Sequence, residues 1–520
     1  MRTTERCPGG GFRRAGGDPV SRCFPQVRRV AQPNLVAALG LCLLVEPAVS
    51  AEWTRGAGFT AGAIYTDNVC LRNTDKLDDT IGVFTPNVRL KGEGARARMD
   101  LYAAAQFNTM EDSDVECGVS GADNISPAPR IRFNGSSELL SNWFFLDATA
   151  FADQNRINPF AAGGEDALDG RGNLNTSYQY AISPYIARRL TDTASLSLRY
   201  RYSEEHNTED VLDDNQRQQV QFDLGTSPEL SRFSVGVGGN YSDIEYEERF
   251  GGDELFNSQL SSAQVRAAFQ WSRSIQFNAY VGEEWNDYVS VFQDSDGGYW
   301  DVGVTWTPNS RVTVELGTGE RFFGESPRAS ISYRHKRSTL RASYLRDLTY
   351  DRSLRGTDPF ADNVDDLVDG GLPNDQGIIG DGGEETTITN SPILDERFLL
   401  VYRFTGRRTT FSANASHSEQ TRAEDGFEDT FVYAGVGVER ALSARLSTYL
   451  RLSWTRREAD QRRGLLAPDS DNARATIGLE RKFGRRTSVG LSYQYNERSS
   501  DNILDEYEEN RVLLQFRYQI

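Results

Sequence analysis

The last ten residues of the chain, Arg511–Ile520, alternate between two kinds of side chain. Apolar side chains occupy every even position, and mostly polar ones occupy the odd positions. A period of two residues is typical of a β-strand. Such a strand at the end of a chain would be an exposed sheet edge unless another strand pairs with it. We therefore expect it to pair with the first strand and to close the sheet into a ring.

The same alternation recurs along the whole chain. Apolar and polar residues alternate in the segments 95–107, 194–203, 233–241, 300–306, 446–454 and 489–495. An antiparallel soluble sandwich shows this pattern too, because one face of its sheet packs on a core and the other meets water. The alternation therefore predicts strands without identifying the architecture.

The connections between these segments identify the architecture, because short and long ones take turns. Short turns are expected at 91–94, 140–142, 188–192, 227–232, 272–274, 308–310, 336–338, 406–408, 440–443 and 483–486. Longer loops rich in Asp, Glu, Asn and Gly are expected at 68–80, 110–125, 154–175, 244–257 and 458–470. Bacterial outer-membrane barrels have short periplasmic turns and long external loops, whereas a sandwich has no reason to sort its loops by length.

We predict an all-β fold, a closed antiparallel transmembrane β-barrel of about 22 strands within a range of roughly 18 to 24. Its turns would be periplasmic and short, its outer loops long and acidic, and both termini would lie in the periplasm. Trp and Tyr residues near the ends of the expected strands fit the two interfacial belts of a bilayer.

The N-terminus, residues 1–51, predicts an export signal. Arg28 and Arg29 precede an apolar run and then the small-residue cleavage site Val49-Ser50-Ala51. The stretch before Val27 is longer than an export signal needs and suggests an over-long start.

Residues 52–520 are expected to form one barrel, since no run of about 18 apolar residues, as a membrane-spanning helix requires, follows the signal. The first strand, expected at 53–68, would follow the signal directly, with no periplasmic plug before it. The longest insertion, 347–396, holds thirteen Asp and Glu and has no Lys or Arg after Arg355. It is expected to cover the mouth or to fold into the lumen, and a disordered acidic loop is the alternative.

If the apolar face meets lipid, the residues between the apolar positions line the lumen, and many of them are arginines. The lumen-lining candidates are Arg96, Arg98, Arg199, Arg201, Arg266, Arg334, Arg341, Arg403, Arg445 and Arg451. Rings of Arg favour the passage of anions. In the alternative interpretation, these arginines pair with acids on neighbouring strands and only stiffen the wall.

Little in the sequence points to catalysis. The chain has three His, His206, His335 and His417, which lie far apart in the pattern, and no nucleophile elbow, phosphate loop or Cys/His metal spacing occurs. We expect no enzyme, no cofactor and no metal site, and the net charge of −18 disfavours nucleic acid as a partner. Cys70 and Cys117 are the only cysteines after the signal, and an exported chain meets an oxidising compartment. The sequence leaves two alternatives, a disulfide between these cysteines or two free thiols.

The segment from Trp53 to Thr109 resembles a family of outer-membrane barrels associated with PEP-CTERM/exosortase exopolysaccharide systems. The matching residues are Thr66-Asp67-Asn68-Val69, Phe84-Thr85-Pro86 and Gly92-Glu93-Gly94-Ala95-Arg96-Ala97-Arg98, with Ile157-Asn158-Pro159-Phe160 further on. The resemblance implies surface polysaccharide biology or a porin-like role, and it supplies no catalytic residues.

Two functions are therefore expected for this chain. The first is a porin-like channel in the Gram-negative cell outer membrane that exports anionic exopolysaccharide. The alternative is a structural or surface-binding outer-membrane protein with an occluded lumen. In either case its partners would be outer-membrane lipid and lipopolysaccharide, the barrel-assembly machinery, and polysaccharide as a candidate ligand.

Overall fold

The computed structural model describes residues 52–520 except 111–116, 118–127, 163–172, 210–211, 227–231, 248–256, 292–294, 351–388 and 463–466. The predicted export signal, 1–51, lies outside the described residues. Within the described part, no helix has the length and apolarity needed to cross a membrane.

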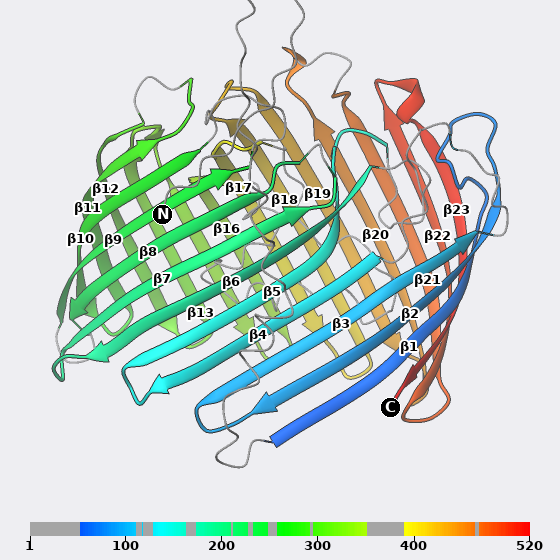
Figure 1. The fold of residues 1–520 in the computed structure, drawn as a ribbon, viewed down its shortest axis with the longest axis horizontal. Helices are drawn as coiled ribbons and strands as arrows, with labels where there is room; N and C mark the ends of the chain where they lie inside the picture. The colour runs from blue at the N-terminus through cyan, green and yellow to red at the C-terminus, as the bar shows by residue number, and fades with distance from the viewer. Residues whose placement is uncertain are drawn as a thin grey trace, which may run out of the picture. The chain divides into compact units, whose positions relative to one another are not determined.

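Long antiparallel strands make up almost all of the described chain (Figure 1). They are β1 (Glu52–Thr66), β2 (Asp79–Glu93), β3 (Ala97–Met110), β4 (Ala128–Leu140), β5 (Phe144–Arg156), β6 (Leu174–Arg189), β7 (Ala194–Asn207), β8 (Asn215–Thr226), β9 (Phe233–Tyr246), β10 (Ser258–Ser272), β11 (Ile275–Asp287), β12 (Gly297–Asn309), β13 (Val312–Arg321), β14 (Gly324–Glu325), β15 (Arg328–His335), β16 (Ser338–Thr349), β17 (Ile393–Thr405), β18 (Thr409–Arg422), β19 (Glu428–Ala441), β20 (Leu446–Glu458), β21 (Ser470–Lys482), β22 (Thr487–Ser500) and β23 (Tyr507–Gln519). A single 3₁₀ turn, η2 (Ile503–Asp505), stands between β22 and β23.

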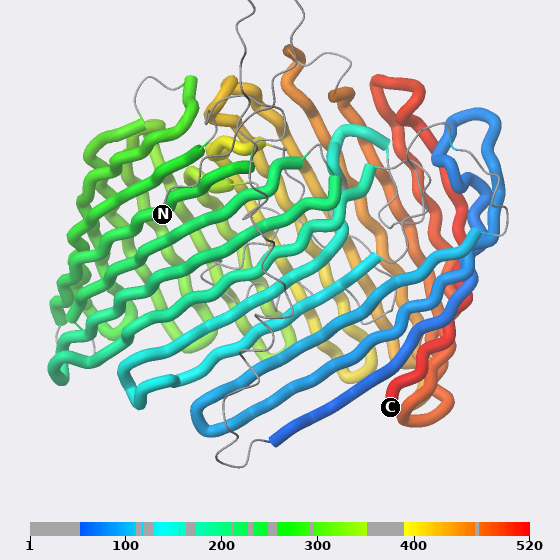
Figure 2. The backbone as a smooth tube through the Cα atoms, in the orientation of Figure 1, coloured from blue at the N-terminus to red at the C-terminus, as the bar shows by residue number. Residues whose placement is uncertain are grey.

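The strands close into one ring. Each long strand pairs with the next along the chain, and β1 pairs with β23 from Gly58↔Gln519 to Thr66↔Arg511 (Figure 2). β14 has two residues and pairs only with the end of β13, which itself continues to β15, so 22 strands form the wall. The predicted closed barrel, its strand number and the pairing of the last strand with the first are confirmed. Closure matters because an open ladder would leave the backbone groups of both edges unpaired.

Contacts across the ring identify its inner face. Phe160, in the loop after β5, packs against Phe431 of β19, and its carbonyl accepts a hydrogen bond from Arg498 Nη2 of β22. Because β19 and β22 lie far round the ring from β5, the side chains of Phe431 and Arg498 must project inward. Alternation along each strand and register between strands then assign the inner face everywhere.

The outer face carries the large apolar side chains. On β12, Trp300, Val302 and Trp306 are 44%, 48% and 47% exposed, whereas Asp301 between them is 2% exposed and faces inward. This is the arrangement that the alternating sequence predicts for a wall with an apolar exterior and a polar interior.

The connections sort by length into two ends. At the short-turn end, β4–β5, β10–β11 and β15–β16 are joined by two or three residues, and Asn142 and Lys336 in these turns adopt positive φ of 57° and 49°. Both ends of the wall also lie there, where the Ile520 amide donates to the Ala57 carbonyl over 2.7 Å. The long-loop end carries the longest connections, such as 67–78 and 350–392, although β18 and β19 are joined there by only five residues.

The boundaries of the longest insertion need correction. Residues 347–396 are not all loop, because β16 continues to Thr349 and pairs there with Ile393, while Asp347 pairs with Asp395. The sequence pattern did not predict these strand ends, because both carry acidic residues and continue past the apolar part of the wall. The loop proper runs from 350 to 392, and the structure describes only Tyr350 and residues 389–392 of it.

Candidate functional site

The lumen and its long-loop mouth form the candidate site. Of the ten predicted lumen-lining arginines, eight lie on the inner face of a strand. They are Arg98, Arg199, Arg201, Arg266, Arg334, Arg341, Arg403 and Arg451. The prediction is wrong for Arg96 and Arg445. These two residues lie in short turns just before β3 and β20 and not on the wall. Alternation alone could not separate these turn positions from strand positions.

Several of these arginines are held by the wall. Arg199 Nη1 donates to Asp147 Oδ2 over 2.9 Å and to Ser183 Oγ over 3.1 Å, and its guanidinium lies 3.8 Å from the centre of the Tyr185 ring. Arg266 forms an ion pair with Asp223. These contacts match the interpretation in which arginines pair across strands and stiffen the wall.

Two inward arginines that the sequence did not single out are held more firmly. Arg328 Nε and Nη2 donate to the two oxygens of Asp301 over 2.9 and 2.6 Å. Arg321 Nε and Nη2 donate to the two oxygens of Glu284 over 2.6 and 2.9 Å, and Arg321 also pairs with Asp347. Fork-like pairs of this kind are strong and geometrically specific.

Glycines on neighbouring strands let these arginines lie flat. A Cβ on Gly317 would stand 2.8 Å from the Arg328 guanidinium carbon, and one on Gly303 would stand 2.6 Å from its Nη2. Gly236 leaves room for Arg266 in the same way, 2.7 Å from its Nε. Glycine at an inward position beside an arginine is the sequence signal that could have distinguished a wall-bound arginine from one that projects into the lumen.

At the long-loop end, residues 157–162 reach across the ring. The ring of Phe160 is 1% exposed and lies 5.7 Å from that of Phe431, and the Phe160 carbonyl is 2.6 Å from Arg498 Nη2. Further along, the Ala162 amide donates to Asp505 Oδ1 over 3.1 Å, and Ala162 packs on Leu71 and Tyr507. A segment that follows β5 is thereby anchored to the wall formed by β19, β22 and β23.

Other loops meet across the same mouth. Asn390, before β17, donates from Nδ2 to Asp213 Oδ2 beyond β7 over 2.6 Å. The Val291 amide, beyond β11, donates to the Ala423 carbonyl beyond β18 over 2.8 Å. Tyr350 is buried beneath the Arg217 guanidinium of β8, and burial raises the pKa of its phenol well above the ordinary value, so that it stays neutral. The described parts of the loops therefore narrow the mouth.

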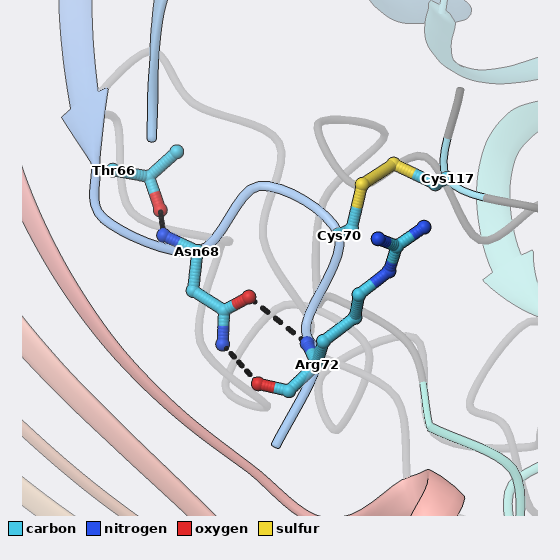
Figure 3. The surroundings of a disulfide bond; sticks show 5 residues. All are labelled: Thr66, Asn68, Cys70, Arg72 and Cys117. Carbon is cyan, nitrogen blue, oxygen red and sulfur yellow. Dashed lines mark hydrogen bonds between the residues drawn. A yellow bond between two sulfur atoms is a disulfide. The ribbon is translucent and has the colours of Figure 1, made fainter. Parts of the chain in front are cut away.

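Cys70 and Cys117 are joined in a disulfide, which links the β1–β2 loop to the β3–β4 loop (Figure 3). Asn68 fixes the turn before it, because its Oδ1 accepts from the Arg72 amide over 2.9 Å and its Nδ2 donates to the Arg72 carbonyl over 2.7 Å (Figure 3). Leu71, next to the disulfide, has a positive φ of 49° and is fully buried. Since Leu71 supports Ala162, the disulfide also braces the segment that crosses the mouth.

The described residues contain no group of three or more His, Cys, Asp or Glu side chains arranged to hold a metal ion. The inward polar groups are instead spread over the whole wall as ion pairs and amides. Such an arrangement can solvate and guide a polar solute.

Solved receptor structures share this fold. The siderophore receptor PirA from Acinetobacter baumannii matches with a TM-score of 0.50 at 9% identity, over 91% of this chain and 81% of that one. A variant of the ferric enterobactin receptor PfeA from Pseudomonas aeruginosa, in complex with enterobactin, matches with a TM-score of 0.50 at 10% identity, over 90% and 81%. No protein-family model matches the chain, and no curated protein is similar to it in sequence. At these identities the likeness defines the class of fold alone, a large closed β-barrel.

Proposed function

We propose that this protein is a barrel of the Gram-negative cell outer membrane that gives polar, anionic solutes a restricted passage. The observation that carries the proposal is the closed ring of 22 strands with an apolar exterior and a polar, arginine-rich interior. A ring of this size encloses more space than the side chains of its wall can fill.

The exterior supports residence in a bilayer. Trp271 and Trp306 lie near the short-turn end and are 66% and 47% exposed, while Trp285 and Trp300 lie near the long-loop end and are 46% and 44% exposed. Two bands of exposed indole rings at the two ends of an apolar wall are what the interfaces of a membrane favour. Outer-membrane lipid and lipopolysaccharide are the partners that this exterior would meet.

Anionic exopolysaccharide is the cargo we propose. This choice of cargo rests on the inward arginines and on the resemblance of residues 53–109 to barrels of PEP-CTERM-associated systems. PirA is a siderophore receptor by name and PfeA a ferric enterobactin receptor. We do not carry these ligands over, because a likeness at this identity concerns the fold. We propose no catalytic activity.

An occluded barrel with a structural or surface-binding role is the second candidate. The observation that favours it is the set of loop contacts across the mouth, above all the anchoring of Phe160 on Phe431 and Arg498. These contacts narrow the passage at the end where a cargo would leave.

Single-channel recording in planar bilayers separates the two candidates. We expect steady conductance from the purified full-length protein, and larger conductance after deletion of the acidic loop between Tyr350 and Thr389. If neither protein conducts, the channel fails and the occluded barrel stands. Neutralising Arg199 and Arg201 should reduce anion selectivity, since it leaves Asp147 without its partner. Unchanged selectivity would show that wall arginines do not set it.

A further inference from the structure

Six cations cluster at the short-turn ends of β15, β16, β17 and β18. This basic patch consists of Arg334, Lys336, Arg337, Arg403, Arg407 and Arg408. The two stretches that contain it, 328–346 and 397–418, hold no Asp or Glu at all, although the whole chain has a net charge of −18. The patch is therefore a strong local reversal of the charge of the protein.

The members of the patch are neighbours in the sheet. Arg334 pairs with Thr339, and Thr339 pairs with Arg403, so the two arginines lie two strands apart on the inner face. Two strand spacings amount to about 10 Å. The adjacent turns are tied together, because the Thr405 amide donates to the Arg337 carbonyl over 2.8 Å. The patch thus runs from the rim of the barrel onto its inner wall.

None of the six side chains forms an ion pair with any described residue, and all six are exposed. This separates them from Arg199 and Arg328, which are held by Asp147 and Asp301. Like charges so close together repel one another, and an anion bound between them would relieve that repulsion.

Lys336 adds an independent observation. Its φ of 49° lies in the left-handed region, which glycine or asparagine occupies more easily than lysine. The turn therefore keeps a cation at a position where a neutral residue would fit with less strain.

We propose that the basic patch binds an acidic polysaccharide where it enters the barrel at the short-turn end. The proposal deepens the proposed function and rests on it for the direction of travel, which runs from the basic end towards the acidic long-loop end. Repeated carboxylates along a sugar chain can meet Arg334 and Arg403 together with the turn cations outside them. Lipid headgroups could reach the turns, but not the two arginines inside the ring, and for this reason we infer a polymer.

Fluorescence anisotropy with labelled oligogalacturonate tests the patch on the detergent-solubilised full chain. Replacing both inner cations, Arg334→Gln with Arg403→Gln, should weaken binding about tenfold, given a few-fold for each exposed charge pair. The matched control, Arg189→Gln with Arg273→Gln, removes the same charge elsewhere at the short-turn end, from the last residue of β6 and from the β10–β11 turn. It should change binding less than about twofold. Equal weakening by the two double variants would overturn the site and leave only a general effect of net charge.

Lys336→Gly tests the patch without the risk of destabilising the fold, because glycine adopts the positive φ of this position easily. We expect weaker binding of oligogalacturonate and an unchanged or higher Tm. Asn142→Gly, at another positive-φ position in a short turn, should leave binding unchanged. Undiminished binding by Lys336→Gly would count against the patch.

Two further outcomes separate the proposals. If the Arg334 and Arg403 variants lose phosphatidylglycerol from nanodiscs but keep oligogalacturonate binding, a lipid site replaces ours. If the protein conducts and oligogalacturonate blocks the current from the long-loop side only, the direction of entry is wrong while the channel stands. Selective binding at the patch without any conductance would instead refute the channel and leave the anion site.

Discussion

Phe160→Ala should open the mouth of the barrel. Phe160 is 1% exposed, and its ring packs on Phe431 and Ala467 at the far wall. Truncation of a buried Phe to Ala costs about 3–5 kcal/mol. If this burial holds residues 157–162 across the ring, the balance between the anchored and the released segment shifts roughly a hundredfold to a few thousandfold.

The second anchor should fail along with the first. The hydrogen bond from Arg498 to the Phe160 carbonyl is charge-assisted and contributes about 1.5–3 kcal/mol, but it forms only while the segment lies on the wall. Release should therefore be cooperative, and Arg498→Met should produce a weaker form of the same effect.

Planar-bilayer recording provides the measurement, with liposome swelling as a second assay. We expect Phe160→Ala to raise conductance or the fraction of time spent open. Phe277→Ala is the matched control, because its ring is 47% exposed on the outer face of β11 and touches no mouth contact. If Phe160→Ala conducts no better than the wild type and the control, residues 157–162 do not restrict the lumen.

Three further predictions follow from the contacts described above. Replacing Cys70 and Cys117 by serine removes a link across 47 residues, worth about 4 kcal/mol in the chain-entropy account, and should lower Tm. An unchanged Tm would show that the disulfide does not stabilise the fold by restricting the unfolded chain. Gly317→Ala should displace the arginine that lies over it and cost about 1–3 kcal/mol in a urea titration, whereas Gly56→Ala, which has room for a Cβ, should not. An arginine two residues further on holds the pKa of Asp460 well below its ordinary value. The contribution of this pair to stability is therefore fully present above the unfolded pKa of about 3.9, declines below it, and is gone once the pH has fallen through the lower folded pKa. Asp460→Asn should thus be less stable than the wild type near neutral pH and equally stable in acid, and a difference independent of pH would contradict this.

The wall was predictable because each strand carries its own signal. A period of two in Arg511–Ile520 and in the other segments specifies a strand and its two faces, whatever its neighbours are. The sorting of connections by length added the ring, and a terminal strand without a tail required a partner, which the pairing with Gly58–Thr66 supplies.

The mouth and the fate of individual arginines were not predictable, because they depend on contacts between distant segments. Ile157-Asn158-Pro159-Phe160 stood out in the sequence, yet nothing in it names Phe431 or Arg498 as partners. Arg199 and Arg334 look alike in their own strands. Only the folded sheet shows that Arg199 meets Asp147 from two strands away, whereas Arg334 forms no ion pair with any described residue.

The seam between β1 and β23 makes assembly an all-or-none event. Its partners are the first and last parts of the wall, so no incomplete chain can finish the ring, however well its hairpins have formed. Until Gln519 docks beside Gly58, two rows of amides and carbonyls remain bare, and hydrocarbon penalises each bare group by several kcal/mol. In the outer-membrane role proposed above, a nonsense mutation that removes only the final strand should therefore abolish insertion and not merely weaken it.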